Sequence, residues 1–281
     1  MLAMDAEPMT SNTQVPIEPE ELGVGPVQPN DDVRAELVTL LEADNSRLGQ
    51  VYRLLQRGLD ANAIADELEV ATSNFVWNNE RVVKALLDGN LPTAPTVALG
   101  VAHKFRAILR TSRLSNSARS YLQSNLQELE RRADDDTARA AEVQLAQEKT
   151  QVAEARNDVG IYVYALPHYL RYPFDPASGR TLMKVGRSDS DVITRFRSQT
   201  RTTALPEEPI LLRVYRTDGS AAAPIESDFH RLLEAADHSR SVARSAGREW
   251  FLTSIRFLDE IARVLKLSVE VVNEDTGLDE D

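Results

Sequence analysis

Cysteine is missing from this sequence of 281 residues, which excludes disulfide bonds and thiolate metal sites. No apolar run approaches the roughly 20 residues that a membrane span needs. The first residues also lack the basic-then-apolar order of a secretory signal. These absences predict a cytoplasmic protein with no membrane partner.

The acidic residues are distributed unevenly along the chain. The net charge is −12, but residues 159–272 hold 16 Lys and Arg against 14 Asp and Glu, a net of +2, which leaves −14 for the rest. Salt screens charges that lie more than about 10 Å apart. The acidic total therefore does not exclude a local basic face that binds nucleic acid.

Changes in pattern divide the chain into five segments. Residues 1–30 contain five prolines and no periodicity, which predicts a disordered leader. Residues 31–132 show helical periodicity. Residues 133–157 predict a helical connector, favoured as a solvated spacer, or a short coiled coil that would form a homodimer. Residues 158–272 alternate strands with helices, and residues 273–281 form an acidic tail.

A helix-turn-helix could lie within the helical segment. A short helix starting at Asp60 is followed by a turn and then by a longer helix from about Asn74. We expect the second helix to expose three asparagines and two cations, which suit adenine edges and phosphates: Asn74, Asn78, Asn79, Arg81 and Lys84. A plain helical bundle would show the same pattern, so both interpretations stay open.

Four short apolar runs after residue 158 predict strands, at 160–165, 182–186, 209–215 and 249–252. Helical patterns start at Asp191, cover 221–236 and start again at Ser254. A small antiparallel sheet flanked by helices is an α+β domain. The predicted architecture is thus an all-α region, a helical connector and an α+β domain.

Five motifs follow one another through this α+β segment. They are Gly160-Ile161-Tyr162, Lys184-Val185-Gly186-Arg187-Ser188, Arg195, Glu226 with His230, and Glu249-Trp250-Phe251. The ordered set resembles the GIY-YIG nuclease superfamily, most closely its phage-type branch, over about a third of the chain. The resemblance implies a bacterial or phage endonuclease that hydrolyses phosphodiester bonds in DNA with Mg²⁺ or Mn²⁺.

The resemblance also implies a role for each site residue. Glu226 would bind the metal, and His230, four residues later on the same helical face, would lie near the metal or the phosphate. Tyr162 would orient or deprotonate the attacking water, although Tyr164 shares its face of the strand. Lys184 would act as a base or hold the phosphate.

Arginines complete the implied site. Arg187 would be catalytic or bind the DNA backbone, and Arg195 would hold phosphate oxygens with its guanidinium group. Gln199 stands where some members have a histidine, which removes one acid. A rim of cations, including Arg197 and Arg201, would contact phosphates. We expect Tyr162, Arg195 and Glu226 to converge on one concave face.

Each of these residues could instead have a purely structural or surface role. Glu226 could form a surface salt bridge, His230 could lie on a helix surface, the tyrosines could be strand packing, and the arginines could be solvated. The function is then one of three: a metal-dependent DNA endonuclease, a non-cleaving DNA-binding regulator with the same fold, or an interaction protein that assembles through residues 133–157. Placement of Glu226 and Tyr162 on opposite sides of the sheet would exclude delivery of water by this carboxylate and phenol together, and the regulator would then replace the endonuclease.

Overall fold

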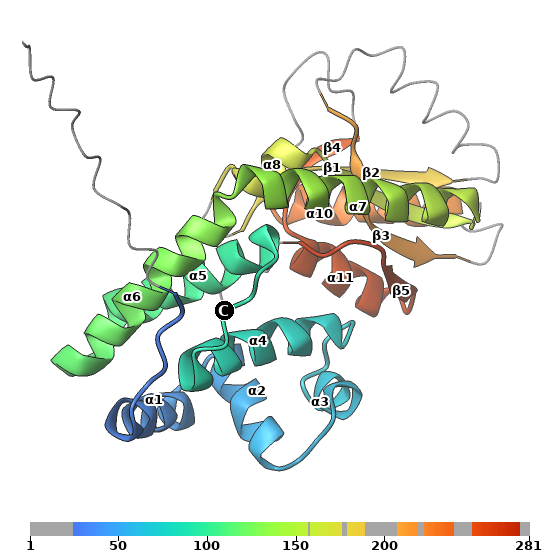
Figure 1. Ribbon diagram of the computed structural model, residues 1–281. Helices are drawn as coiled ribbons and strands as arrows, with labels where there is room; N and C mark the ends of the chain where they lie inside the picture. Colours follow the sequence, from blue (N-terminus) through green and yellow to red (C-terminus); the bar gives the residue numbers. More distant parts are fainter. Residues whose placement is uncertain are drawn as a thin grey trace, which may run out of the picture.

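A computed structural model describes residues 25–156, 158–175, 179–188, 207–217, 222–238 and 249–275. Within these residues, six helices precede a long helix that lies across a five-stranded sheet (Figure 1). The chain therefore has a helical N-terminal region followed by a sheet with helices, which confirms the predicted α+β fold class.

The first four helices are α1 (Asp31–Ala43), α2 (Arg47–Gln56), α3 (Ala61–Glu67) and α4 (Asn74–Asp88). Asn30 caps α1, because its side chain accepts a hydrogen bond from the Val33 amide. Asp60 caps α3 as predicted, accepting from two backbone amides. Helix α4 ends at Gly89, whose positive φ of 62° suits glycine.

Two longer helices, α5 (Pro95–Thr111) and α6 (Asn116–Ala133), complete the helical region. They pack against α1, α2 and α4 around a core that includes Leu37, Leu86, Phe105 and Leu122. A second, smaller core lies between α2, α3 and α4. The α3–α4 pair therefore packs on α2 beside the main core, and the helix-turn-helix stays a prediction.

The sheet runs in the order β4-β2-β1-β3-β5 with every neighbouring pair antiparallel. Its strands are β1 (Gly160–Ala165), β2 (Thr181–Ser188), β3 (Ile210–Arg216), β4 (Trp250–Thr253) and β5 (Ser268–Val271). The first four match the predicted strands, whereas β5 is an addition. Its sequence is short and only partly buried, so it carries a weak periodic signal.

Strand alternation divides the sheet into two faces. On the face that we call the α10 face, Ile161, Val163 and Val185 pack with Phe229 of α10 (Ala222–Ala235) and Leu258 of α11 (Ile255–Val264). On the opposite face, which we call the α7 face, Tyr162, Tyr164, Leu211 and Val214 pack with Ala153 of α7 (Asp136–Ala155). A short helix, α8 (Pro167–Arg171), follows β1. Each sheet face therefore has its own helical cover.

Helix α7 is bound to the sheet along its second half. Thr150 Oγ1 accepts a hydrogen bond from the Leu211 amide at 3.0 Å, and Glu154 Oε1 accepts one from the Tyr164 hydroxyl at 3.0 Å. Both residues are buried. The interpretation of residues 133–157 as a solvated spacer is thus wrong for this half of α7, because its polar side chains bond to strands. The homodimer through residues 133–157 stays a prediction.

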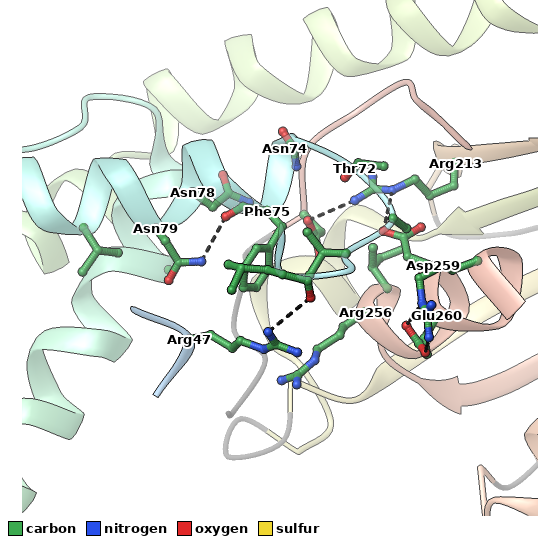
Figure 2. A pocket seen from close by; sticks show the side chains of 18 of the residues that line it. Arg47, Thr72, Asn74, Phe75, Asn78, Asn79, Arg213, Arg256, Asp259 and Glu260 are labelled. Atoms are coloured by element: carbon green, nitrogen blue, oxygen red, sulfur yellow. Dashed lines mark hydrogen bonds and ion pairs between the residues drawn. The ribbon is translucent and has the colours of Figure 1, made fainter. Parts of the chain in front are cut away.

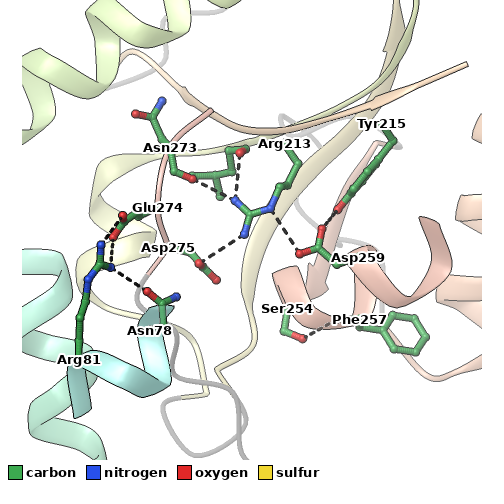
Figure 3. A network of polar contacts seen from close by, with 11 residues as sticks. Asn78, Arg81, Arg213, Tyr215, Ser254, Phe257, Asp259, Asn273, Glu274 and Asp275 are labelled. Carbon is green, nitrogen blue, oxygen red and sulfur yellow. Dashed lines mark hydrogen bonds and ion pairs between the residues drawn. The ribbon is translucent and has the colours of Figure 1, made fainter. Parts of the chain in front are cut away.

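The start of the expected acidic tail is also part of the fold (Figure 3). Asn273 donates from its side chain to the carbonyl groups of Ala146 in α7 and Leu211 in β3, at 3.1 and 2.9 Å. Asp275 lies 3.6 Å from the Arg213 guanidinium. Residues 273–275 are therefore anchored between α7 and the sheet, and not a free tail.

Arg213 is the charged residue on which this anchoring depends. Its side chain is 2% exposed and contacts the Asp259 carboxylate at 3.4 Å and the carbonyl groups of Leu212 and Asn273 at 3.1 and 3.0 Å. Tyr215 donates to the other oxygen of Asp259 at 2.8 Å. Burial raises the pKa of Asp259, and the positive charge of Arg213 opposes that rise.

We expect Arg213→Met to lower the free energy of unfolding by about 3–5 kcal/mol, because it leaves the Asp259 carboxylate buried without its cation. Arg57→Met removes one partner of an exposed pair with Glu67 and should cost about 1 kcal/mol or less. Urea unfolding followed by circular dichroism measures both. Equal, small losses in the two variants would show that Arg213 does not hold this part of the fold.

Candidate active site

Gly160 begins β1 and allows an unusually close approach to β3. A Cβ atom at this position would lie 2.3 Å from the carbonyl oxygen of Tyr215, so any side chain would push the strands apart. The register then places Tyr162 opposite Gly186 and Ile161 opposite Arg187. The first two motifs are therefore neighbours in the sheet, and cross-strand partners share a face.

Arg187, Glu226 and His230 come together on the α10 face. Arg187 Nη1 lies 3.2 Å from Glu226 Oε2. One turn further along α10, His230 Nε2 lies 3.0 Å from the carbonyl oxygen of Val185. Because a carbonyl oxygen only accepts, Nε2 carries the proton of the neutral ring and Nδ1 is its acceptor. The structure thus brings together three of the predicted site residues around the second half of β2.

Glu226 is the carboxylate of this group, and its surroundings shift its pKa. Burial raises its pKa, and the nearby charge of Glu249 raises it further, while His230 and Arg187 oppose the rise. Its side chain is 15% exposed, so solvent or a ligand can reach it. Carboxylates whose negative charge is largely buried and only partly neutralised by neighbouring cations are common in functional sites.

Lys184 and Glu249 form a second charged pair at the margin of the sheet. Lys184 Nζ lies 3.2 Å from Glu249 Oε2. Lys184 pairs with Tyr164 and therefore points to the α7 face. Glu249 immediately precedes β4, so its charge reaches both Lys184 and Glu226. The sequence motif contained Glu249 but gave it no role, and only the strand pairing shows that it borders the site.

Tyr162 lies beneath α7 on the opposite face from Glu226. Its side chain is buried, and its hydroxyl donates to the carbonyl oxygen of Asp158 at 2.5 Å. Burial, with the negative charge of Asp158 next, raises its pKa to about 12. The expectation that Tyr162 and Glu226 share one concave face is therefore wrong: strand alternation turns the phenol toward α7, while Glu226 is on α10.

Arg195, Arg197 and Arg201, like Gln199, lie outside the described residues. Among the residues that are described, no group of three or more His, Asp or Glu side chains could hold a metal ion. A cation at Glu226 would thus need further oxygen ligands from substrate phosphate and from water, which is the usual arrangement for Mg²⁺.

Two of the predicted DNA-contacting residues of α4 are buried, and a third pairs with a carboxylate of the same chain. Asn74 and Asn79 are buried, and Asn79 donates its side-chain amide to the carbonyl oxygen of Phe75. Arg81 pairs with Glu274. The expectation that α4 exposes both Asn74 and Asn79 is wrong, because α2 and α3 cover one side of this helix and the sheet domain faces another.

A cavity of about 380 Å³ separates α4 from α11 (Figure 2). Asn74, Phe75 and Asn78 line it from α4, and Arg256 and Asp259 line it from α11. The two helices thus face each other across a gap rather than through close packing.

Comparison with known proteins identifies one family. Residues 160–266, well under half of the chain, match the T5orf172 domain. The match begins at the first residue of β1 and includes every described site residue of the sheet domain. None of the curated proteins and none of the solved structures matches the chain. No helix in the described part of the chain combines the length and apolar character needed to cross a bilayer. The matched domain is consistent with a nuclease or a DNA-binding role.

Tyr162→Phe tests the assignment of this phenol to the fold. Loss of the bond to Asp158 should cost about 1 kcal/mol at pH 7. Because the folded pKa of about 12 lies above the ordinary value of 10, the stabilisation is present below pH 10 and is lost between pH 10 and 12. Urea unfolding across this range measures it, with Tyr172→Phe, an exposed side chain, as the control. A cost that persists unchanged at pH 12 would contradict the assignment.

Proposed function

We propose that this protein is a metal-dependent DNA endonuclease with its active site on the α10 face at the second half of β2. The observation that carries the proposal is the convergence of Glu226, Arg187 and His230. Arg187 of β2 and Glu226 of α10 are 39 residues apart in sequence. The T5orf172 match and the resemblance to GIY-YIG nucleases support the same class of reaction.

The residues present fit a divalent cation at Glu226. Its carboxylate supplies hard oxygen ligands, and its raised pKa shows that burial is not fully compensated by Arg187. A bound Mg²⁺ or Mn²⁺ would polarise the phosphate and stabilise the charge that develops on its oxygens. The second carboxylate, Glu249, adds negative charge at the same margin of the sheet.

The other residues of the site have separate tasks in hydrolysis. Arg187 would bind a phosphate oxygen if a divalent cation replaced it beside Glu226, since a guanidinium group fits phosphate geometry. His230 holds its Nε2 proton against the Val185 carbonyl, so Nδ1 is the nitrogen that would accept a proton from water. The water oxygen would bond to phosphorus, the bond to the sugar oxygen would break, and that oxygen would take up a proton from solvent. Tyr162 takes no part, so the proposed reaction uses Glu226 and His230 in place of the pair of Glu226 and Tyr162 that the sequence led us to expect.

The remaining site roles are proposals that extend this one. Lys184, held by Glu249, would contact the phosphate backbone beside the site, and Arg195, Arg197 and Arg201 would supply further cations. Asn78 and Arg81 of α4 would contact DNA through the helical region, with α3 and α4 as the helix-turn-helix. DNA is therefore the proposed partner of both regions.

Glu226→Gln should abolish nicking of supercoiled plasmid in Mg²⁺ or Mn²⁺, a loss of at least about 100-fold, because it removes the anionic ligand. Since the raised pKa means that the fold disfavours the charged carboxylate, stability at pH 7 should stay equal or rise slightly. Asp228→Asn makes the same charge change on the same helix, at a residue paired with Arg231, and should leave nicking intact. Nicking by Glu226→Gln at the wild-type rate would contradict the proposal.

A non-cleaving DNA-binding regulator is the second candidate. The observation that favours it is the placement of Tyr162 on the face opposite Glu226, with its hydroxyl already bonded to Asp158. The same experiment separates the two functions. Duplex binding by wild type and Glu226→Gln alike, with no nicking by either in Mg²⁺ or Mn²⁺, would support the regulator.

A further inference from the structure

Arg81 of α4, a predicted DNA-contacting residue, already holds an anion within the chain. Its two terminal nitrogens lie 2.8 and 3.0 Å from the two carboxylate oxygens of Glu274 (Figure 3). One of them also donates to the Asn78 side chain at 2.9 Å. This is the two-pronged geometry by which a guanidinium group binds either a carboxylate or a phosphate.

The residues on both sides of Glu274 hold it next to Arg81. The side chain of Asn273 donates to carbonyl groups of α7 and β3. Asp275 lies against the buried Arg213 (Figure 3). The amides of Val272 and Asn273 also donate to the Leu212 carbonyl oxygen. The segment is thus fixed to the sheet domain, and from it the side chain of Glu274 reaches across to the helical region.

Another anion can replace Glu274 in its salt bridge with Arg81. The side chains of Arg81 and Glu274 are each 35% exposed, so the pair is worth little more than a surface salt bridge. The cavity between α4 and α11 leaves this part of the boundary without close packing (Figure 2). An external anion can therefore compete for Arg81 without breaking a hydrophobic core.

We propose that Glu274 is a built-in competitor of DNA, occupying on α4 the place that a backbone phosphate of duplex DNA takes when the helical region binds. The inference rests on the proposed function and adds regulation of its DNA-contacting helix. Because the segment is tethered to the same chain, its effective concentration at Arg81 is high and DNA must displace it. Binding through α4 is thereby held below its full strength until the segment moves.

Glu274→Gln tests the competitor by removing its charge while keeping its shape. Fluorescence anisotropy with a labelled 20-base-pair duplex should show an affinity roughly two- to fivefold higher than that of wild type. Arg81→Gln should lower the affinity, and Glu274→Gln should have no effect when added to Arg81→Gln, because the two residues act through one contact.

Glu130→Gln is the matched control, since it makes the same charge change in a surface pair with Arg106 at 2.8 Å. Its duplex affinity should stay close to that of wild type. An unchanged affinity of Glu274→Gln, or an equal gain in the Arg81→Gln background, would overturn the competitor while leaving the endonuclease intact. Failure of all variants and wild type to bind or nick DNA would instead contradict the proposed function.

Discussion

The guanidinium group of Arg213 determines how the parts of this molecule meet. A buried charge is tolerated only where it is paired and hydrogen-bonded, and Arg213 draws its partners from α11, from its own strand and from residues 273–275. A β-bulge between Val163 and Tyr164 shifts the register of β3 at this point. The hydrogen-bond and ion-pair partners that Arg213 needs therefore fix the course of the chain after β5. This course brings Glu274 within reach of α4.

Strand alternation is the second constraint, and it divides the motif residues between two environments. Tyr162, Tyr164 and Lys184 face α7, while Arg187 lies opposite Ile161 and meets α10. The α10 face has a carboxylate with a raised pKa and a histidine whose Nδ1 makes no hydrogen bond to the described residues, whereas the phenols on the α7 face are both hydrogen-bonded. The chemistry proposed for the site follows from the first group alone.

Much of the fold could be predicted from local sequence signals. Asp60 and Ser254 cap helices where expected, and the first four strands follow their apolar runs. Long-range polar contacts could not be predicted: nothing near Asn273 in sequence shows that it binds α7, and Glu154 reads as a solvent-facing residue of a charged helix. The hydrogen-bond partners of these side chains lie too far away in the sequence to be found from its periodicity.

The sequence predicted which residues form the candidate site, but not on which face of the sheet each of them lies. The spacing of Glu226 and His230 places both on one side of α10, and the structure has them there. The position of Tyr162 relative to that helix depends on which sheet face α10 covers, which is a question of topology. The role of Glu249 likewise depends on strand pairing between β2 and β4.

The bond from Asn273 to α7 also bears on the order of events during translation. Its acceptor, Ala146, leaves the ribosome 127 residues earlier. At a synthesis rate of roughly 5–20 residues per second, α7 waits on the order of 10 s for this partner. The helical region of residues 31–132 is synthesised before α7 and has its own hydrophobic core, so it can fold while α7 lacks this hydrogen bond.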